Sequence, residues 1–252
     1  MPALSAVIIT LNESRNIRRC LESLQGIADE IIVVDSGSTD DTESICRSFK
    51  VKFISREWTG YSDQKNFGNS QASHHWVFSI DADEALSPEL QQSVLRVKAL
   101  PEAGNYRINR QTNYCGKWIR HSGWFPDIKV RFFDRRETLW EGLIHERLNV
   151  PDEKQIPLLK GVCYHYTYYT RAEHREQAER FAALSARELM NRGRQPGLLK
   201  RHLGPPFRFF RMFFLQLGFL DGAAGYHIAR ISAWAVRRKY FILNELYAQR
   251  KS

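Results

Sequence analysis

The chain contains few cysteines, and none of them is close in sequence to another. Its 252 residues include only four, which are Cys20, Cys46, Cys115 and Cys163. Zinc sites and redox centres typically need cysteine pairs that are about two to four residues apart. We therefore expect reduced thiols, with neither a structural zinc site nor a disulfide framework.

Long apolar runs are also missing. No stretch reaches the ~18 uninterrupted apolar residues that a membrane-spanning helix requires. Residues 1–11 lack the basic start and the long apolar run of a secretory signal. These absences predict a protein that acts in the cytoplasm.

A glycine-rich phosphate loop is absent from the segment that follows the first apolar run. Residues 10–16 do not contain the pattern Gly-x-Gly-x-x-Gly that cradles the pyrophosphate of a dinucleotide. A dinucleotide cofactor is therefore disfavoured.

Acidic residues are scarce in the last quarter of the chain. The net charge is +9, and between positions 192 and 252 twelve lysines and arginines face only Asp221 and Glu245. This excess predicts an anionic partner, which is a nucleic acid, a nucleotide phosphate or an acidic membrane surface. The composition of the whole chain is that of a globular protein, with 43% hydrophobic and 26% charged residues.

Short apolar runs alternate with segments of helical spacing in the first hundred residues. The predicted strands are 6–11, 30–35, 51–55 and 76–81, and the predicted helices begin near residues 17, 40, 62 and 87. Alternating strands and helices imply crossover connections and a parallel sheet with helices on both faces. We expect a Rossmann-like α/β fold with a mostly parallel sheet.

The residue composition and the hydrophobic pattern change after Pro101. Aromatic and β-branched segments at 106–114, 129–134 and 162–169 predict added strands, and 171–191 predicts one long helix. We expect a first domain over 1–169, which divides into two halves at about residue 100. Residues 170–252 are expected to form a helical extension.

Two carboxylates lie at and just after the end of the predicted strand at 76–81. Asp81 and Asp83 are separated only by Ala82, and in an extended chain they project to the same side. Hard oxygen ligands of this kind suit Mg²⁺ or Mn²⁺, which takes its remaining ligands from water and substrate phosphates. The alternative interpretation is an acidic turn that caps the next helix.

Polar loops follow the first two predicted strands at the same edge of the sheet. Thr10 to Glu13 ends the first strand and Asp35 to Asp40 ends the second, with Gly37 allowing a close backbone approach. Such side chains are suited to a nucleobase and a ribose. Helix capping by Asn12 and Asp40 is an alternative that is compatible with ligand contact.

These motifs together resemble the family 2 inverting glycosyltransferases of the GT-A fold. The resemblance rests on their order along the chain, including Gln64, Lys65 and Asn66. It implies that Lys65 contacts the diphosphate of the donor. The alternative is that Lys65 is an exposed residue of a helix. It also implies that Asp81 contacts the ribose and Asp83 binds the metal ion. The side chains implied to hold a uridine-type nucleotide are Thr10, Asn12, Glu13 and Asp35.

A second, narrower resemblance covers residues 118–169. The segments 121–127, 131–133 and 140–146 are similar to lipopolysaccharide core β-glucosyltransferases. This resemblance implies that Glu146, in the pair His145-Glu146, is the general base, with Glu141 and Asp127 as rivals and a structural salt bridge as the other explanation. It implies acceptor contacts by Trp124, Asp127 and His145, although core packing also explains a tryptophan. On a late strand, His165 resembles an additional metal ligand.

The basic tail carries many large apolar side chains between 207 and 220, with Arg208 and Arg211 interleaved. Such a segment suits an anionic membrane surface, while packing on the catalytic domain or on a second subunit is the alternative. The sequence therefore allows an oligomer, in which this apolar surface contacts a second subunit.

We expect a metal-dependent transferase that moves glucose from UDP-glucose to an inner-core sugar of lipopolysaccharide. Its expected place is the inner face of the cell membrane, with a lipid-linked glycan as acceptor and no nucleic acid. A polyprenyl-phosphate glycosyltransferase is an alternative that would normally show spanning helices after the catalytic domain. Alternatives from another class are a nucleic-acid-binding protein, recognised by steep salt dependence, and a non-catalytic scaffold.

Overall fold

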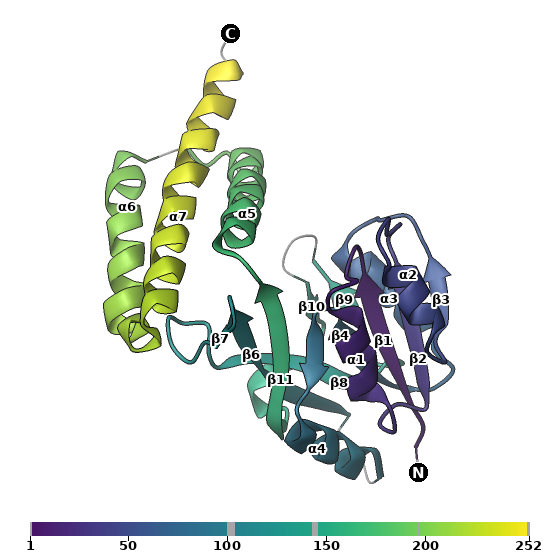
Figure 1. Ribbon diagram of the computed structural model, residues 1–252. Coiled ribbons are helices and arrows are strands. Elements are labelled where there is room, and N and C mark those ends of the chain that lie inside the picture. Colours follow the sequence, from purple (N-terminus) through teal and green to yellow (C-terminus); the bar gives the residue numbers. More distant parts are fainter. Residues whose placement is uncertain (1, 100–103, 143–145, 196, 251–252) are drawn as a thin grey trace. The chain divides into compact units, whose positions relative to one another are not determined.

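A computed structural model describes residues 2–99, 104–142, 146–195 and 197–250 (Figure 1). The chain forms two compact units, the first from residues 1–110 and 127–166 and the second from 111–126 and 167–252. The second unit thus contains the predicted helical extension and also residues 111–126. The functional division at residue 169 stays a prediction.

A parallel sheet forms the first part of the first unit. Its strands lie in the order β3 (Lys52–Ser55), β2 (Glu30–Asp35), β1 (Leu4–Thr10) and β4 (Trp76–Asp81). Thr10 pairs in register with Asp35, and Ile9 pairs with Asp81. The carboxyl ends of β1, β2 and β4 therefore meet at one edge, where sheets of this kind bind their ligands.

Strands of mixed direction continue the sheet beyond β4. The order is β8 (Asp127–Asp134), β6 (Asn105–Tyr114), β11 (Leu158–Tyr168) and β5 (Glu84–Leu86). β8 is antiparallel to β4 and to β6, and β5 is antiparallel to β11. The ends of β6 and β11 belong to the second unit, where β7 (Lys117–Trp118) pairs with β6. A separate two-stranded sheet joins β9 (Trp140–Glu141) to β10 (Arg147–Leu148), and a short 3-10 helix, η1, covers Glu153–Gln155. The expected α/β class is confirmed, with a parallel part that ends at β4.

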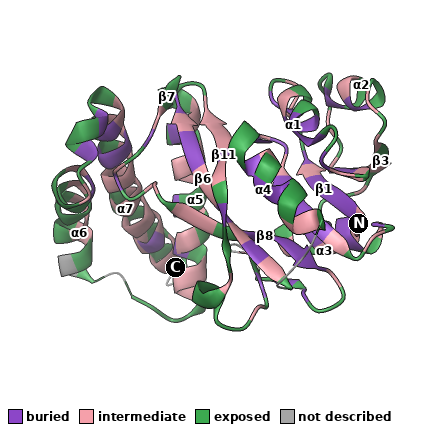
Figure 2. Ribbon diagram, turned by 90° about the horizontal axis from the view of Figure 1, so that it is seen from below, coloured by how far each residue is buried: buried purple, intermediate pink, exposed green. Residues whose placement is uncertain are grey.

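Among the described residues, four helices cover the sheet of the first unit, and the two faces of the sheet have separate cores. The helices are α1 (Ile17–Leu24), α2 (Thr42–Arg47), α3 (Tyr61–Ser70) and α4 (Pro88–Ala99). Ala6 and Ile8 of β1 pack in one core with α1 and α4, whereas Val7 packs in the other with Phe67 of α3. This alternation is the two-residue period of a strand that is buried on both faces. The central strands are accordingly purple in Figure 2.

The second unit is mainly helical. In Figure 1, α7 (Ala223–Gln249) lies between α5 (Arg171–Asn191) and α6 (Leu198–Phe210). A π-helical turn, η2 (Arg211–Leu215), and a 3-10 turn, η3 (Gly218–Asp221), connect α6 to α7. The first turn of α5 has a capping box, formed by Thr170 and Glu173. Among the described residues, no helix is both long enough and apolar enough to cross a membrane.

A buried histidine makes the stability of the second unit sensitive to acid. His174 is 5% exposed, its Nδ1 lies 3.2 Å from the Tyr114 hydroxyl, and burial lowers its pKa to about 4. Between pH 6.5 and 4 the histidine is protonated in the unfolded chain but neutral in the folded chain, so the free energy of unfolding falls as the pH falls. We expect a loss of up to about 2 kcal/mol from pH 7.5 to 5, measured by urea unfolding. His174→Gln should lose this pH dependence of the free energy of unfolding, whereas replacing the exposed His202 should leave it unchanged. If His174→Gln keeps the full pH dependence, or if the His202 variant changes it equally, the assignment to His174 is wrong.

Candidate functional site

Asp81, the last residue of β4, and Asp83 do not cap the helix that follows. The Asp81 N–H donates to the Glu84 carboxylate at 3.0 Å, which closes a tight turn between β4 and β5. The helix α4 begins later, at Pro88, and its Leu90 N–H donates to the Ser87 hydroxyl at 3.2 Å. The alternative interpretation as an acidic helix cap is therefore wrong.

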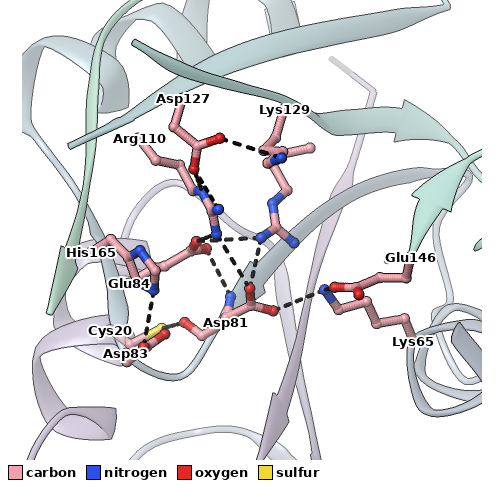
Figure 3. Close-up of polar contacts among 11 residues, drawn as sticks. Cys20, Lys65, Asp81, Asp83, Glu84, Arg110, Asp127, Lys129, Glu146 and His165 are labelled. Atoms are coloured by element: carbon pink, nitrogen blue, oxygen red, sulfur yellow. Dashed lines mark hydrogen bonds and ion pairs between the residues drawn. The ribbon is translucent and has the colours of Figure 1, made fainter. Parts of the chain in front are cut away.

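Asp81 lies in a ring of cationic side chains (Figure 3). Its carboxylate is 2.7 Å from the Arg131 guanidinium, 3.1 Å from Lys65 Nζ and 3.9 Å from Arg110. Burial opposes ionisation, but these three cations hold the pKa of Asp81 well below its usual range. Asp81 is thus a fixed anion and a poor proton acceptor.

Glu84 is the buried centre of the same network. Its side chain is 0% exposed and lies 2.8 Å from Arg110 and 3.3 Å from Arg131. Arg110 also contacts Asp127, with a 2.8 Å bond from Nε. No functional role was predicted for Glu84, Arg110 or Arg131. A signal existed for Arg131, because an arginine inside the apolar run 130–133 needs buried carboxylate partners.

Removing Arg131 is expected to destabilise the first unit strongly. Arg131→Met would leave the buried Glu84 carboxylate and the half-buried Asp81 carboxylate short of a counter-charge, at a cost of about 3–5 kcal/mol. The matched control is Arg47→Met, which breaks an exposed pair with Glu43 and should cost under about 1 kcal/mol. Urea unfolding measures both. Equal stability of the two variants would contradict the proposed importance of the network.

Lys65 joins the Asp81 turn to the predicted base. Its side chain is buried, and Nζ lies 3.1 Å from both the Asp81 and Glu146 carboxylates and 4.7 Å from the centre of the Trp140 ring. Gly68, about one turn later in α3, lets this helix lie close to β1, because a Cβ at position 68 would be only 2.5 Å from Val7 Cγ1. The alternative of an exposed helix residue at position 65 is therefore wrong.

The neighbours of Lys65 hold the surrounding loops. Asn66 exchanges two 2.9 Å hydrogen bonds with the backbone of Trp140, which fixes β9 against α3. Gln64 is fully buried, accepts from Arg56 at 2.6 Å and donates to Ser36 at 3.0 Å. These contacts connect the loop after β2 with the segment that leads to Glu146.

Asp83 and His165 form a separate ion pair next to the network around Asp81. In the antiparallel register of β5 and β11, His165 lies opposite Glu84, and its Nε2 is 3.1 Å from the Asp83 carboxylate. The other ring nitrogen, Nδ1, is buried without a hydrogen-bond partner in the described part of the chain. Burial lowers the pKa of His165 and Asp83 raises it, with an upward net shift.

The donors at Asp83 fit a divalent cation that is shared with a substrate. No group of three His, Cys, Asp or Glu side chains that could hold a metal ion occurs among the described residues. Mg²⁺ and Mn²⁺ usually need only one or two protein ligands when waters and phosphates complete the shell. The imidazole favours Mn²⁺ of the two. Nearby, burial and Asp83 raise the pKa of Glu13 to about 7, as expected where negative charge is concentrated.

The loops at the sheet edge are organised by their own side chains. Asp35 is 3% exposed and accepts from the backbone N–H groups of Gly37 and Ser38 at 3.0 and 2.8 Å. Asn12, at φ +55°, accepts from the Thr39 N–H at 2.8 Å, which ties the first loop to the second. Gly37 has φ +89° and open space at its Cβ position. The hydroxyl of Thr10 is buried without a hydrogen-bond partner among the residues described.

The predicted acceptor residues lie in different parts of the chain. Asp127 belongs to the first unit and pairs with Arg110 and Lys129. Trp124 belongs to the second unit, where its ring packs against Tyr114, 5.9 Å between centroids. His145 is outside the described residues, so only its neighbour Glu146 is placed. The acceptor roles stay predictions.

Comparison with known proteins agrees with this geometry. Residues 5–166 match Glycosyl transferase family 2. An uncharacterized glycosyltransferase of Rickettsia typhi is 30% identical over 98% of this chain and 88% of its own. The lipopolysaccharide core biosynthesis glycosyltransferase LpsC of Rhizobium meliloti is 28% identical, over 94% and 93%. A solved structure of Staphylococcus aureus TarS shares the fold, with TM-score 0.50 and 16% identity over 98% of this chain and 91% of that chain. The chain belongs to glycosyl transferase family 2 and has the GT-A-like fold that its motifs predicted.

Proposed function

We propose that this enzyme transfers glucose from UDP-glucose to an inner-core sugar of lipopolysaccharide, with inversion at the anomeric carbon, at the inner face of the cell membrane. The observation that carries the proposal is the link through Lys65, whose Nζ is 3.1 Å from Asp81 on the donor side and 3.1 Å from Glu146, the predicted base. The relationship to LpsC supports the class of acceptor.

The nucleotide would occupy the edge where β1, β2 and β4 end. Asp35 and Asn12 are already positioned by backbone N–H groups, and Thr10 has an unused hydroxyl among the described residues. Glu13 lies near Asp83, and Gly37 leaves room for the ligand. A buried hydroxyl without a partner supports a ligand that accepts or donates a hydrogen bond at that position.

Displacement at the anomeric carbon needs one proton acceptor. The Glu146 carboxylate would take the proton of the acceptor hydroxyl, whose oxygen forms the new bond to the anomeric carbon. The bond from that carbon to the diphosphate oxygen breaks, and UDP leaves with the electron pair. Asp83 and His165 would hold a divalent cation, which stabilises the charge on the departing diphosphate. No general acid is required, because a diphosphate leaves without protonation.

A donor screen tests the proposal. The full chain is incubated with UDP-, GDP- and ADP-hexoses, with and without Mn²⁺, and then with lipopolysaccharide of truncated core. We expect turnover of UDP-glucose only with the metal, and a product whose anomeric proton shows a β-linkage by NMR. Preference for another nucleotide, retention of configuration or transfer to a polyprenyl phosphate instead would overturn the corresponding part of the proposal.

A further inference from the structure

One helix of the second unit turns its large apolar side chains outward. Leu203, Phe207, Phe210 and Phe214 are 59%, 61%, 49% and 49% exposed. Their spacing of four, three and four residues places them along one side of α6 and η2, which we call the aromatic stripe. Much of α6 is drawn green in Figure 2. Continuous exposure of this kind marks an interaction site more often than it marks an ordinary surface.

The stripe is not needed to hold its own helix. The opposite side of the same segment is anchored by Met212, which is 2% exposed, and by Phe209 and Phe213. These three side chains pack in the core of the second unit with residues such as Ile228 of α7. The segment therefore has an apolar inner side that fixes it and a second apolar side that is about half exposed, where Phe214 also touches Phe213, with 5.1 Å between ring centroids.

The turn after the stripe presents more apolar side chains. Leu215, Leu217, Phe219 and Leu220 are between 45% and 62% exposed. Leu217 is held at φ +55°, a left-handed conformation that is uncommon for leucine. Neither burial nor conformational preference explains an exposed leucine at this strained position, so a role in contact with a partner is indicated.

The segment that carries the stripe also carries positive charge and no negative charge. Residues 198–220 contain Lys200, Arg201, Arg208 and Arg211 but no aspartate or glutamate. Arg208 and Lys239 line one cavity between α5, α6 and α7. Burial, together with Arg208 and Lys200, lowers the pKa of Lys239, as expected for cations gathered without a carboxylate.

This charge distribution selects the partner. In a symmetric dimer the stripe would face its own copy, so the arginines beside it would meet a segment that has no carboxylate to pair with them. A bilayer that contains anionic lipids offers phosphates to the cations and acyl chains to the aromatic rings. We propose that residues 198–220 bind the surface of an anionic lipid bilayer, with the aromatic stripe entering the acyl boundary and the neighbouring cations contacting lipid phosphates.

Vesicle co-sedimentation of the full chain tests this proposal without any nucleotide, so its result is independent of the glycosyltransfer reaction. The protein is mixed with vesicles of phosphatidylcholine alone or with about 30% phosphatidylglycerol. We expect binding to the anionic vesicles, weakened as NaCl rises from about 0.05 to 0.5 M. The variant Phe207→Ser/Phe210→Ser/Phe214→Ser should partition at least about tenfold more weakly.

A matched triple variant replaces other exposed apolar residues, Leu139, Leu158 and Phe241, by serine and should bind like the parent protein. If the stripe variant does not fold, as judged by circular dichroism, the charge variant Arg208→Glu/Arg211→Glu provides the second measurement and should also lose binding to anionic vesicles. Two outcomes overturn the proposal: no binding of the parent protein to either vesicle, or binding that both sets of variants retain. A parent dimer that the stripe variant converts to a monomer, without vesicle binding, would identify a subunit contact instead.

Discussion

Asp83→Asn is expected to lower kcat for glycosyl transfer by about 10²–10³-fold while the protein stays folded. Asp83 and His165 are the donors that fit a divalent cation, and no larger cluster of possible metal ligands occurs in the part of the chain that the structure describes. Asparagine keeps the size of the side chain but removes its charge. Developing charge on the diphosphate would then lack most of its stabilisation.

Binding measurements separate a metal role from general damage. Calorimetric titration with UDP should show Mn²⁺-dependent binding for the parent protein and for Glu137→Gln, whose exposed side chain lies near the start of β4, away from Asp83. Asp83→Asn should lose the part of the affinity that depends on Mn²⁺. Unchanged metal dependence in this variant would assign Asp83 a structural role and remove the metal site from the proposal.

The parallel part of the fold was predictable because its signals are local. Apolar runs of strand length at 6–11, 30–35 and 76–81 correspond to β1, β2 and β4, and the polar residues after them do meet at one edge. The position of the helix after β4 was also readable, since Ser87 and Pro88 are typical of a helix start. The order of β8, β6, β11 and β5 was not predictable, because it depends on pairing between segments far apart in sequence.

Site residues could be predicted where their type and their position at the end of a strand identified them. The pairing of His165 with Asp83 depends on the register of β11 against β5, which sequence patterns do not define. Buried charges were harder still. Lys65 follows the start of a helix with weak amphipathic character, and nothing local shows that it is buried between Asp81 and Glu146. Glu84, Arg110 and Arg131 compensate one another only in three dimensions.

The network also explains why one rival to the predicted base is disfavoured. Burial tends to raise the pKa of Asp127, but Arg110 and Lys129 lower it below the usual value. A carboxylate held by two cations, one of them through a 2.8 Å hydrogen bond from Arg110 Nε, is a weak proton acceptor. Within the described ranges the only ion pair of Glu146 is with Lys65, and 22% of its side chain is exposed, so one oxygen can face an acceptor hydroxyl.

Glu146→Gln is therefore expected to lower kcat for transfer by about 10²–10⁴-fold, since the amide cannot take the proton of the attacking hydroxyl. The contact with Lys65 can persist through the amide oxygen, so affinity for UDP with Mn²⁺ should stay within about twofold of the parent value, because the lost group acts only in the chemical step. Transfer to the acceptor and binding of UDP are measured on the same preparations.

The rival carboxylates supply the controls for this experiment. Glu141→Gln changes an exposed side chain in β9, and Asp127→Asn changes a carboxylate already held by cations, so neither should lower kcat by more than about tenfold. A loss concentrated in Asp127→Asn or Glu141→Gln, with Glu146→Gln active, would move the base to that residue. Loss of UDP affinity in Glu146→Gln would instead assign Glu146 to the support of Lys65 and Asp81, because a residue that acts only on the acceptor leaves donor binding unchanged.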